Sequence, residues 1–421
     1  MNAQEPWWGI PDGAAAMPGG TVTIRSTEVS PEPGVSPGPR VVAPPADTAR
    51  SWGGSIRRGI VGFGRGGWEL AALVVLLAVL AAIPVLQLIA FGYLLEVAGR
   101  LTRGQSLGSA LPNRPQAGRI GLALAALWLA SLPVQLLAHW ASAAALIDPH
   151  SAQIVGLKLA AAGAALFAFA YLAWAWIRGG RCRDYLWPQP TRFLREGWRW
   201  RTWREAPDRL WGFTASLGLP SRFWLGLRGA AGTLVWMVPG FVIIAANREG
   251  RTGLAGLVGA AAVLALGIVL LYLPMLQANF AAENRLRALF AVATVRSDFR
   301  RAPWAWFAAM VTALWLTPIP LYLLKIEATP REVLWLPCLV FVMMMLPARV
   351  ATGLALRRAR RRPEPSGRWA VASRWLVRLL MPAVVGLYLL FLTASQYTSW
   401  DGLETWVRQH AFLVPVPFVG V

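Results

Sequence analysis

The chain has little charge and few residues that could carry metal or nucleophilic chemistry. Only 14% of its 421 residues are Asp, Glu, Lys or Arg, against about 25% in an ordinary soluble domain. Two distant cysteines, Cys182 and Cys338, exclude a disulfide scaffold. The lysines, Lys158 and Lys325, do not follow a glycine, which excludes a Gly-Lys-Ser/Thr phosphate-binding loop. The three histidines lack metal-ligand spacing, so neither a metal nor a cofactor is expected.

Apolar sequence is present in excess, in long uncharged runs. Hydrophobic residues make up 56% of the chain, and the mean hydropathy is +0.48. A soluble protein of this composition would need one very large core, whereas single cores stop growing near about 250–300 residues. We therefore predict an all-α polytopic helical membrane protein with seven or eight transmembrane segments. The predicted segments cover residues 70–95, 120–147, 159–177, 223–246, 252–282, 302–324, 333–356 and 379–399.

Composition divides the chain into four parts. Residues 1–67 are expected to be a disordered tail, because the first fifty residues hold nine prolines and six glycines with little apolar periodicity. The first half of the membrane bundle covers residues 68–246 and includes an Arg- and Trp-rich loop at 178–222. The second half covers residues 247–400, and residues 401–421 form a C-terminal tail.

The two halves of the bundle share short strings in the same order. The string P-x-L-Q begins at Pro84 and again at Pro274, and A-L-W-L followed by a proline begins at Ala126 and again at Ala313. This order predicts a four-plus-four duplication in parallel orientation, as between the halves of some transporters.

The positive charge is strongly biased to one side of the predicted bundle. The connections at 100–119, 178–228, 285–301 and 349–378 hold 29 arginines and lysines, against 6 in the other connections and the C-terminal tail. By the positive-inside rule the first set faces the cytoplasm, which predicts a location in the inner membrane of a bacterium. Two alternatives stay open for the first segment: it crosses the membrane, or Pro84 breaks it into a re-entrant hairpin.

The Arg- and Trp-rich loop predicts a helix that lies flat at the membrane surface over residues 192–205. Aromatic rings at headgroup depth and guanidinium groups against anionic lipid suit such a helix, and Pro207 is expected to end it. Membrane lipids, especially those with anionic headgroups, are therefore the expected partners; no nucleic acid is expected, because lipid lies next to this loop. The predicted lipid-interface residues are Arg192, Phe193, Arg195, Trp198, Arg199, Trp200, Trp203 and Arg204.

Few polar side chains interrupt the apolar segments. Gln87, Gln277, Asn279 and Glu283 are candidates to line a cavity, and hydrogen bonding between helices is the alternative role. Arg349 is expected near an end of its segment or snorkelling toward the interface, so no ionisable group is expected at mid-depth.

Residues 92–104, with the sequence G-Y-L-L-E-V-A-G-R-L-T-R-G, resemble an uncharacterised bacterial multi-pass membrane protein family of unknown function. That family shows G-Y-L-L, a basic helix end and a glycine, but the arginine that it carries after G-Y-L-L is Glu96 here. The resemblance covers about thirty residues and implies a multi-pass membrane protein without an established activity.

No convergent set of catalytic residues is visible, so we do not expect an enzyme. The leading hypothesis is a non-catalytic membrane component that organises anionic lipid or binds a membrane protein partner. A permease or transporter subunit for a small molecule is the alternative, and a membrane-embedded enzyme is the least favoured class.

The charge bias makes a testable prediction about topology. Single cysteines placed in the 178–222 and 357–368 connections should resist an impermeant thiol reagent in intact cells and react after the cells are broken. Labelling of both connections from outside would overturn the predicted orientation.

Overall fold

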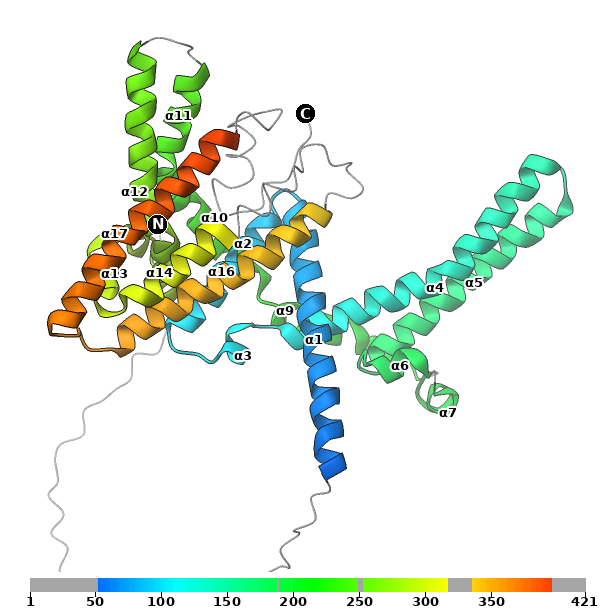
Figure 1. Ribbon diagram of the computed structural model, residues 1–421. Helices are drawn as coiled ribbons and strands as arrows, with labels where there is room; N and C mark the ends of the chain where they lie inside the picture. Colours follow the sequence, from blue (N-terminus) through cyan, green and yellow to red (C-terminus); the bar gives the residue numbers. More distant parts are fainter. Residues whose placement is uncertain (1–51, 188, 198, 249–252, 317–334, 396–421) are drawn as a thin grey trace, which may run out of the picture. The chain divides into compact units, whose positions relative to one another are not determined.

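The computed structural model describes residues 52–187, 189–197, 199–248, 253–316 and 335–395. Helices make up 88% of these residues and none of them lies in a strand, which confirms the all-α fold. The elements are drawn in Figure 1. The longer helices are α1 (Trp52–Ala82), α2 (Gln87–Thr102), α4 (Arg114–Ile147), α5 (Ala152–Ile177), α9 (Ala206–Ser216), α10 (Leu219–Trp236), α11 (Val238–Arg248), α12 (Gly253–Glu283), α13 (Val292–Arg301), α14 (Pro303–Val311), α16 (Trp335–Arg361) and α17 (Arg368–Ser395). The short elements are α3 (Leu107–Ala110), α6 (Cys182–Leu186), α7 (Pro190–Arg192), the π-helical turn η1 (Phe193–Gly197), α8 (Trp200–Arg204), the 3₁₀ turn η2 (Leu286–Phe290) and the π-helical turn η3 (Thr312–Leu316).

Several helices are long and apolar enough to cross a bilayer, as a multi-pass membrane protein requires. Within the described ranges there are six: Gly62–Ala82, Arg114–Ile147, Ala152–Ile177, Gly253–Glu283, Cys338–Arg361 and Arg368–Phe391. They correspond to six of the eight segments predicted from the sequence.

The other two predicted segments are not continuous α-helices. The fourth is divided into α10 and α11 at Met237, because Pro239 cannot donate the helical hydrogen bond to the residue four positions before it. The sixth is α14 followed by η3, and the remainder of it lies outside the described residues.

The first predicted segment is broken where Pro84 stands. Helix α1 ends at Ala82, Val85 has a left-handed φ of 71°, and α2 begins at Gln87. Apolar side chains of α1 and α2 then share one buried cluster with α16. The helix at Trp52 also begins inside the 1–67 stretch expected to be a tail, so the expected tail extends too far. The rest of that tail and the C-terminal tail lie outside the described residues.

Helix α2 lies against α10, α12 and α16 at very short distance. A Cβ at Gly92 would overlap the backbone carbonyl of Arg222 in α10, and one at Gly226 would overlap the carbonyl of Leu88 in α2. A Cβ at Gly99 would come within 2.5 Å of the Ala281 carbonyl oxygen in α12, and one at Gly353 of α16 within 2.7 Å of the Ala98 carbonyl oxygen in α2, which is also too close. Glycine is needed at these positions because only a residue without a side chain lets two helix backbones approach so closely.

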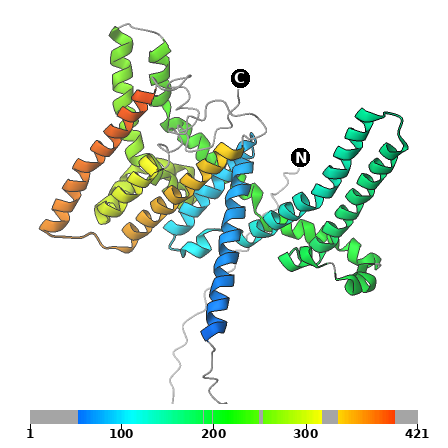
Figure 2. The same ribbon diagram turned by 45° about the vertical axis from the view of Figure 1, so that its right-hand side comes forward.

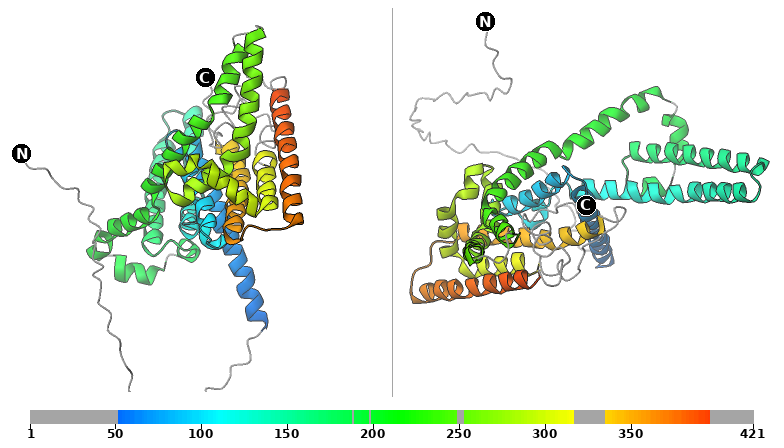
Figure 3. Two further views of the ribbon diagram at one scale, coloured as in Figure 1. Left: turned by 90° about the vertical axis from the view of Figure 1, so that its left-hand side faces the viewer. Right: turned by 90° about the horizontal axis from the view of Figure 1, so that it is seen from above.

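Two further pairs of helices lie side by side. Helix α11, of 11 residues, lies side by side with part of α12, of 31 residues (Figure 3). Helices α4 and α5 form a hairpin (Figure 2) whose surface is apolar and exposed, as at Leu146, Ile147 and Phe167. At the start of α4, the Trp68 indole donates to the Gly118 carbonyl at 3.1 Å, which ties the hairpin to α1.

The close approach of α2 and α10 predicts that Gly92→Ala destabilises the protein. We expect a loss of roughly 1–3 kcal/mol, because the two backbones must separate to admit the new methyl group. Gly163→Ala in α5 is the matched control, since a Cβ there has no neighbour within 4 Å. Thermal unfolding midpoints measured in one detergent test this, and a Gly92→Ala midpoint at or above that of the control would contradict it.

Candidate functional site

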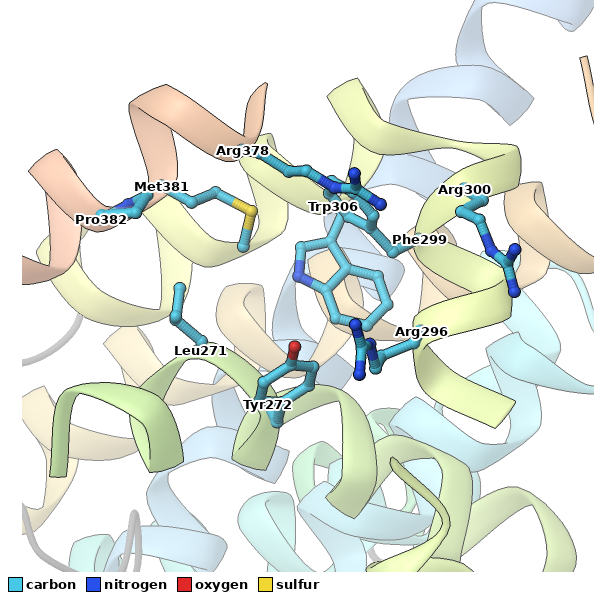
Figure 4. A pocket seen from close by; sticks show the side chains of 9 residues that line it. All are labelled: Leu271, Tyr272, Arg296, Phe299, Arg300, Trp306, Arg378, Met381 and Pro382. Carbon is cyan, nitrogen blue, oxygen red and sulfur yellow. The ribbon is translucent and has the colours of Figure 1, made fainter. Parts of the chain in front are cut away.

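A pocket of about 300 Å³ lies between α12, α13, α14 and α17 (Figure 4). We call it the arginine pocket. Its lining combines three guanidinium groups with aromatic and apolar side chains, and none of the lining residues that the structure describes is a carboxylate. The lining residues are Leu271, Tyr272, Arg296, Phe299, Arg300, Trp306, Arg378, Met381 and Pro382.

The lining side chains of the arginine pocket mainly offer hydrogen-bond donors. In Figure 4, Arg296 and Arg378 approach the Trp306 indole from opposite sides, and the indole nitrogen points toward Leu271 and Tyr272. Trp306 is 2% exposed, and its N–H has no hydrogen-bond partner within the described part of the chain. Because leaving a buried donor unpaired is costly, this N–H indicates a ligand or water that accepts from it.

Aromatic rings hold the arginine pocket together. The Phe299 and Trp306 rings meet edge to face with centroids 5.7 Å apart. The Arg378 guanidinium lies over Phe299 at 5.8 Å and over Trp375 at 5.4 Å, within the range of cation–π attraction. These contacts fix Arg378 without neutralising its charge.

Helix α13 directs its charges in two directions. Arg296 and Arg300, one turn apart, are exposed on the side of the pocket, while Asp298 is buried and pairs with Arg360 of α16 at 3.3 Å. Burial raises the pKa of the Asp298 carboxyl, although the Arg360 charge acts in the opposite direction. The one carboxylate of this helix is therefore kept away from the arginine pocket.

A second, more open groove of about 620 Å³ runs between α14 and α16. Alanines of both helices line one part of it, and Arg357, Arg358, Arg361 and Arg362 line the other. Arg357 and Arg361 donate to backbone carbonyls in the turn after α2, so part of this arginine cluster joins helices.

Two of the four predicted cavity-lining residues belong to a buried polar network instead. The Gln277 amide donates to Thr233 Oγ1 at 2.8 Å, and its Oε1 accepts from Arg349 Nη1 at 2.6 Å. Asn279 donates to the Ala288 carbonyl at 2.9 Å and accepts from Arg360. Both amides are fully buried, and they join α12 to α10, η2 and α16.

The other two predicted cavity-lining residues lie apart. Gln87 is half-buried at the start of α2, and its Oε1 has no partner among the described residues. Glu283 is exposed at the end of α12. None of the four residues lines the arginine pocket or the α14–α16 groove.

The expectation for Arg349 is wrong. It is the twelfth of the 24 residues of the Cys338–Arg361 span, it is 2% exposed, and its side chain points inward to Gln277. The side chain bonds to the Gln277 carbonyl oxygen and lies against the Phe91 ring, whose centroid is 5.5 Å from the guanidinium carbon, so it does not snorkel. One arginine inside a long apolar run is the signal in the sequence that marks this site.

Glu96, where the resembling family has arginine, bridges two arginines. It accepts from Arg100 at 2.6 Å and from the buried Arg222 at 2.8 Å, which joins α2 to α10. Burial acts to raise the pKa of the Glu96 carboxyl, but the hydrogen bonds and charges of the two arginines outweigh it and hold that pKa below its usual value.

The predicted surface helix over residues 192–205 is also wrong as a single element. The stretch forms α7, η1 and α8, with Arg199 extended between η1 and α8, and Pro207 lies in the first turn of α9, where proline is favoured, rather than ending a helix. The lipid-interface residues within the described ranges are exposed, Trp200 at 79%, and Trp198 lies outside those ranges. Phe193 packs edge to face on Trp174 of α5 at 5.2 Å, and the Trp203 indole donates to the Gly197 carbonyl.

The Glu96 bridge predicts that Glu96→Gln lowers stability. We expect a loss of about 3–5 kcal/mol, because Arg222 is left buried without its carboxylate. Since the folded-state pKa of Glu96 is depressed, this contribution is present at neutral pH and is lost as the pH falls through that pKa.

The matched control for that prediction is Glu205→Gln. Glu205 also bridges two arginines, Arg201 and Arg209, at 3.0 Å each, but at the surface. Its unfolding midpoint should stay near that of the unmodified protein, and equal losses from both changes would show that burial of Arg222 is not the cause.

In the described part of the chain, no group of three or more His, Cys, Asp or Glu residues is placed to hold a metal ion. No family model, curated protein or solved structure matches the chain, so the functional argument starts from these contacts.

Proposed function

We propose that this multi-pass membrane protein is a non-catalytic component of a bacterial inner membrane that binds an anionic phospholipid in the arginine pocket. The observation that carries the proposal is the buried, unpartnered indole N–H of Trp306 in a pocket with three guanidinium groups and no carboxylate. A lipid phosphate offers several acceptor oxygens and a negative charge, which complements this set of donors.

The apolar part of the pocket favours a lipid over a soluble phosphate. Leu271, Met381 and Pro382 come from two apolar helices, α12 and α17, both long enough to cross the bilayer. A headgroup held by the arginines would leave its acyl chains beside these helices. The pocket also lies among the connections that the charge distribution predicts to be cytoplasmic, where anionic lipid attracts arginine.

The exposed stretch around α7, η1 and α8 supports the same proposal. Its arginines and the highly exposed Trp200 suit contact with a lipid surface, although they do not form one helix. We propose that this stretch holds the membrane surface weakly, while the arginine pocket holds one lipid molecule more tightly.

The alternative, a permease, has less support from the contacts. Gln277 and Asn279 make hydrogen bonds with protein groups and line neither the arginine pocket nor the α14–α16 groove. For this reason we place lipid binding first.

The proposal predicts that Arg296→Gln/Arg378→Gln weakens binding of phosphatidylglycerol about thirtyfold. Each arginine contributes about 1 kcal/mol near an anionic lipid, and about 1.4 kcal/mol corresponds to a factor of ten. Native mass spectrometry of the delipidated protein, titrated with phosphatidylglycerol or phosphatidylcholine, measures this. Trp306→Phe, which removes the indole N–H together with one ring but keeps an aromatic side chain, should weaken phosphatidylglycerol binding in the same direction.

Two controls make the measurement decisive. Arg285→Gln/Arg287→Gln removes the same charge from exposed residues outside the arginine pocket, the α14–α16 groove and the α7–η1–α8 stretch, and should leave the affinity within a factor of a few. Soluble glycerol 3-phosphate should bind much more weakly than the lipid. Equal affinity for both lipids, or a larger loss from the control pair than from the pocket pair, would refute the proposal; equal binding of glycerol 3-phosphate would identify a soluble ligand.

A further inference from the structure

Arg349 differs from every other buried charged side chain in the described part of the chain. Four others are buried, and each has a partner of opposite charge within 4 Å: Glu69 with Arg65 and Arg114, Asp184 with Arg183, Arg222 with Glu96, and Asp298 with Arg360. Arg349 has no carboxylate among the described residues and only the neutral Gln277 as a hydrogen-bond partner.

Two of the three guanidinium nitrogens of Arg349 have no hydrogen-bond partner among the described residues. Nη1 donates to Gln277 Oε1 at 2.6 Å, while Nε and Nη2, both buried, have no hydrogen-bond partner within the described ranges. The Nε and Nη2 edge presents two parallel N–H groups, the arrangement that arginine uses to bind anions. The Phe91 ring provides some cation–π attraction, but it cannot accept from that edge in the plane of the guanidinium.

A second arginine near Arg349 makes binding of a negative charge there more favourable. Arg360 lies eleven residues further on α16, three helical turns away on the same face, and it reaches Asn279, two residues from the partner of Arg349. Among the described residues, Asp298 is the only carboxylate bound to either arginine, and it pairs with Arg360. Two guanidinium groups therefore meet the same turn of α12, and within the described ranges the one carboxylate bound there pairs with Arg360, so the buried charge of Arg349 is left uncompensated, which is costly.

We infer that the Nε and Nη2 edge of Arg349 binds a small monovalent inorganic anion, of which chloride is the usable probe. A donor-only edge selects an anion over a cation. Close helix packing around Phe91 and Gly229 selects a small ion over a lipid phosphate: Gly229 of α10 already lies against Phe91, Leu95 and Phe280. Arg349 lines neither the arginine pocket nor the α14–α16 groove. The anion site at Arg349 and lipid binding in the arginine pocket can therefore be tested separately, and failure of one does not refute the other.

The test is the dependence of thermal unfolding on the anion. The purified full chain is heated in sodium chloride or sodium gluconate at equal ionic strength, and intrinsic tryptophan fluorescence reports unfolding. A bound anion stabilises only the folded state, so the midpoint of the unmodified protein should rise with the logarithm of chloride concentration above the dissociation constant, and gluconate should not reproduce the rise. Arg349→Gln should abolish the chloride dependence, whereas Arg349→Lys, which keeps the charge, should retain part of it.

Arg358→Gln is the matched control, because it removes an exposed arginine from the same helix and should leave the chloride dependence unchanged. Saturable binding of radioactive chloride to the unmodified protein, displaced by bromide and not by gluconate, tests the site even if Arg349→Gln does not fold. Equal midpoints in chloride and gluconate, no saturable chloride, or an unchanged chloride response in a folded Arg349→Gln protein would each overturn the inference.

Discussion

The close approach of helix backbones to α2 is the constraint on which the rest of the structure depends. At Gly92 and Gly226 the backbones of α2 and α10 leave no room for a side chain, and at Gly99 and Gly353 α12 and α16 approach α2 almost as closely. In a membrane the lipid is as apolar as the helices, so association relies on close packing and on buried hydrogen bonds. Small residues on α2 allow the close packing. The close packing in turn brings polar groups near enough to form the buried hydrogen bonds.

The polar contacts follow from that geometry. Once α2, α10, α12 and α16 converge, Glu96 can reach Arg222, and Gln277 can reach both Thr233 and Arg349. These are bonds between residues distant in sequence, and in a low-dielectric interior each unpaired member would be costly. The same balance explains why the arginine pocket stands out: it brings three guanidinium groups and the buried Trp306 N–H together, and none of its described lining residues is a carboxylate.

Hydropathy could predict the class of fold and the position of most spans, because a long apolar run must become a helix wherever it is buried in lipid. It could not predict which side of each helix meets protein. Lipid and protein interior are both apolar, so the sequence around Arg349 is compatible with snorkelling or with burial, and only the side chain of Gln277, 72 residues away, decides between them.

The sequence cannot predict the arginine pocket for a related reason, since its nine lining residues come from four helices and form no local motif. The spacing of Arg and Trp over residues 192–205 predicts one helix, whereas the π-helical turn η1 ends at Gly197 and Pro207 lies in the first turn of the separate helix α9.

The α4–α5 hairpin has a consequence for how the protein responds to its bilayer. Helix α4 has 34 residues, about 51 Å at 1.5 Å per residue, against a hydrocarbon thickness of about 30 Å. Its contacts to α1, through Gly118 and Gly121, are at its first turns, and α5 is held by Phe193 at its last turns, so both anchors lie at the same end of the hairpin. The opposite end, near Leu146 and Ile147, is almost fully exposed. A helix longer than the hydrocarbon core accommodates the difference by tilting, kinking or locally thickening the bilayer, so bilayer thickness acts on the free end of this hairpin while its base stays fixed to α1.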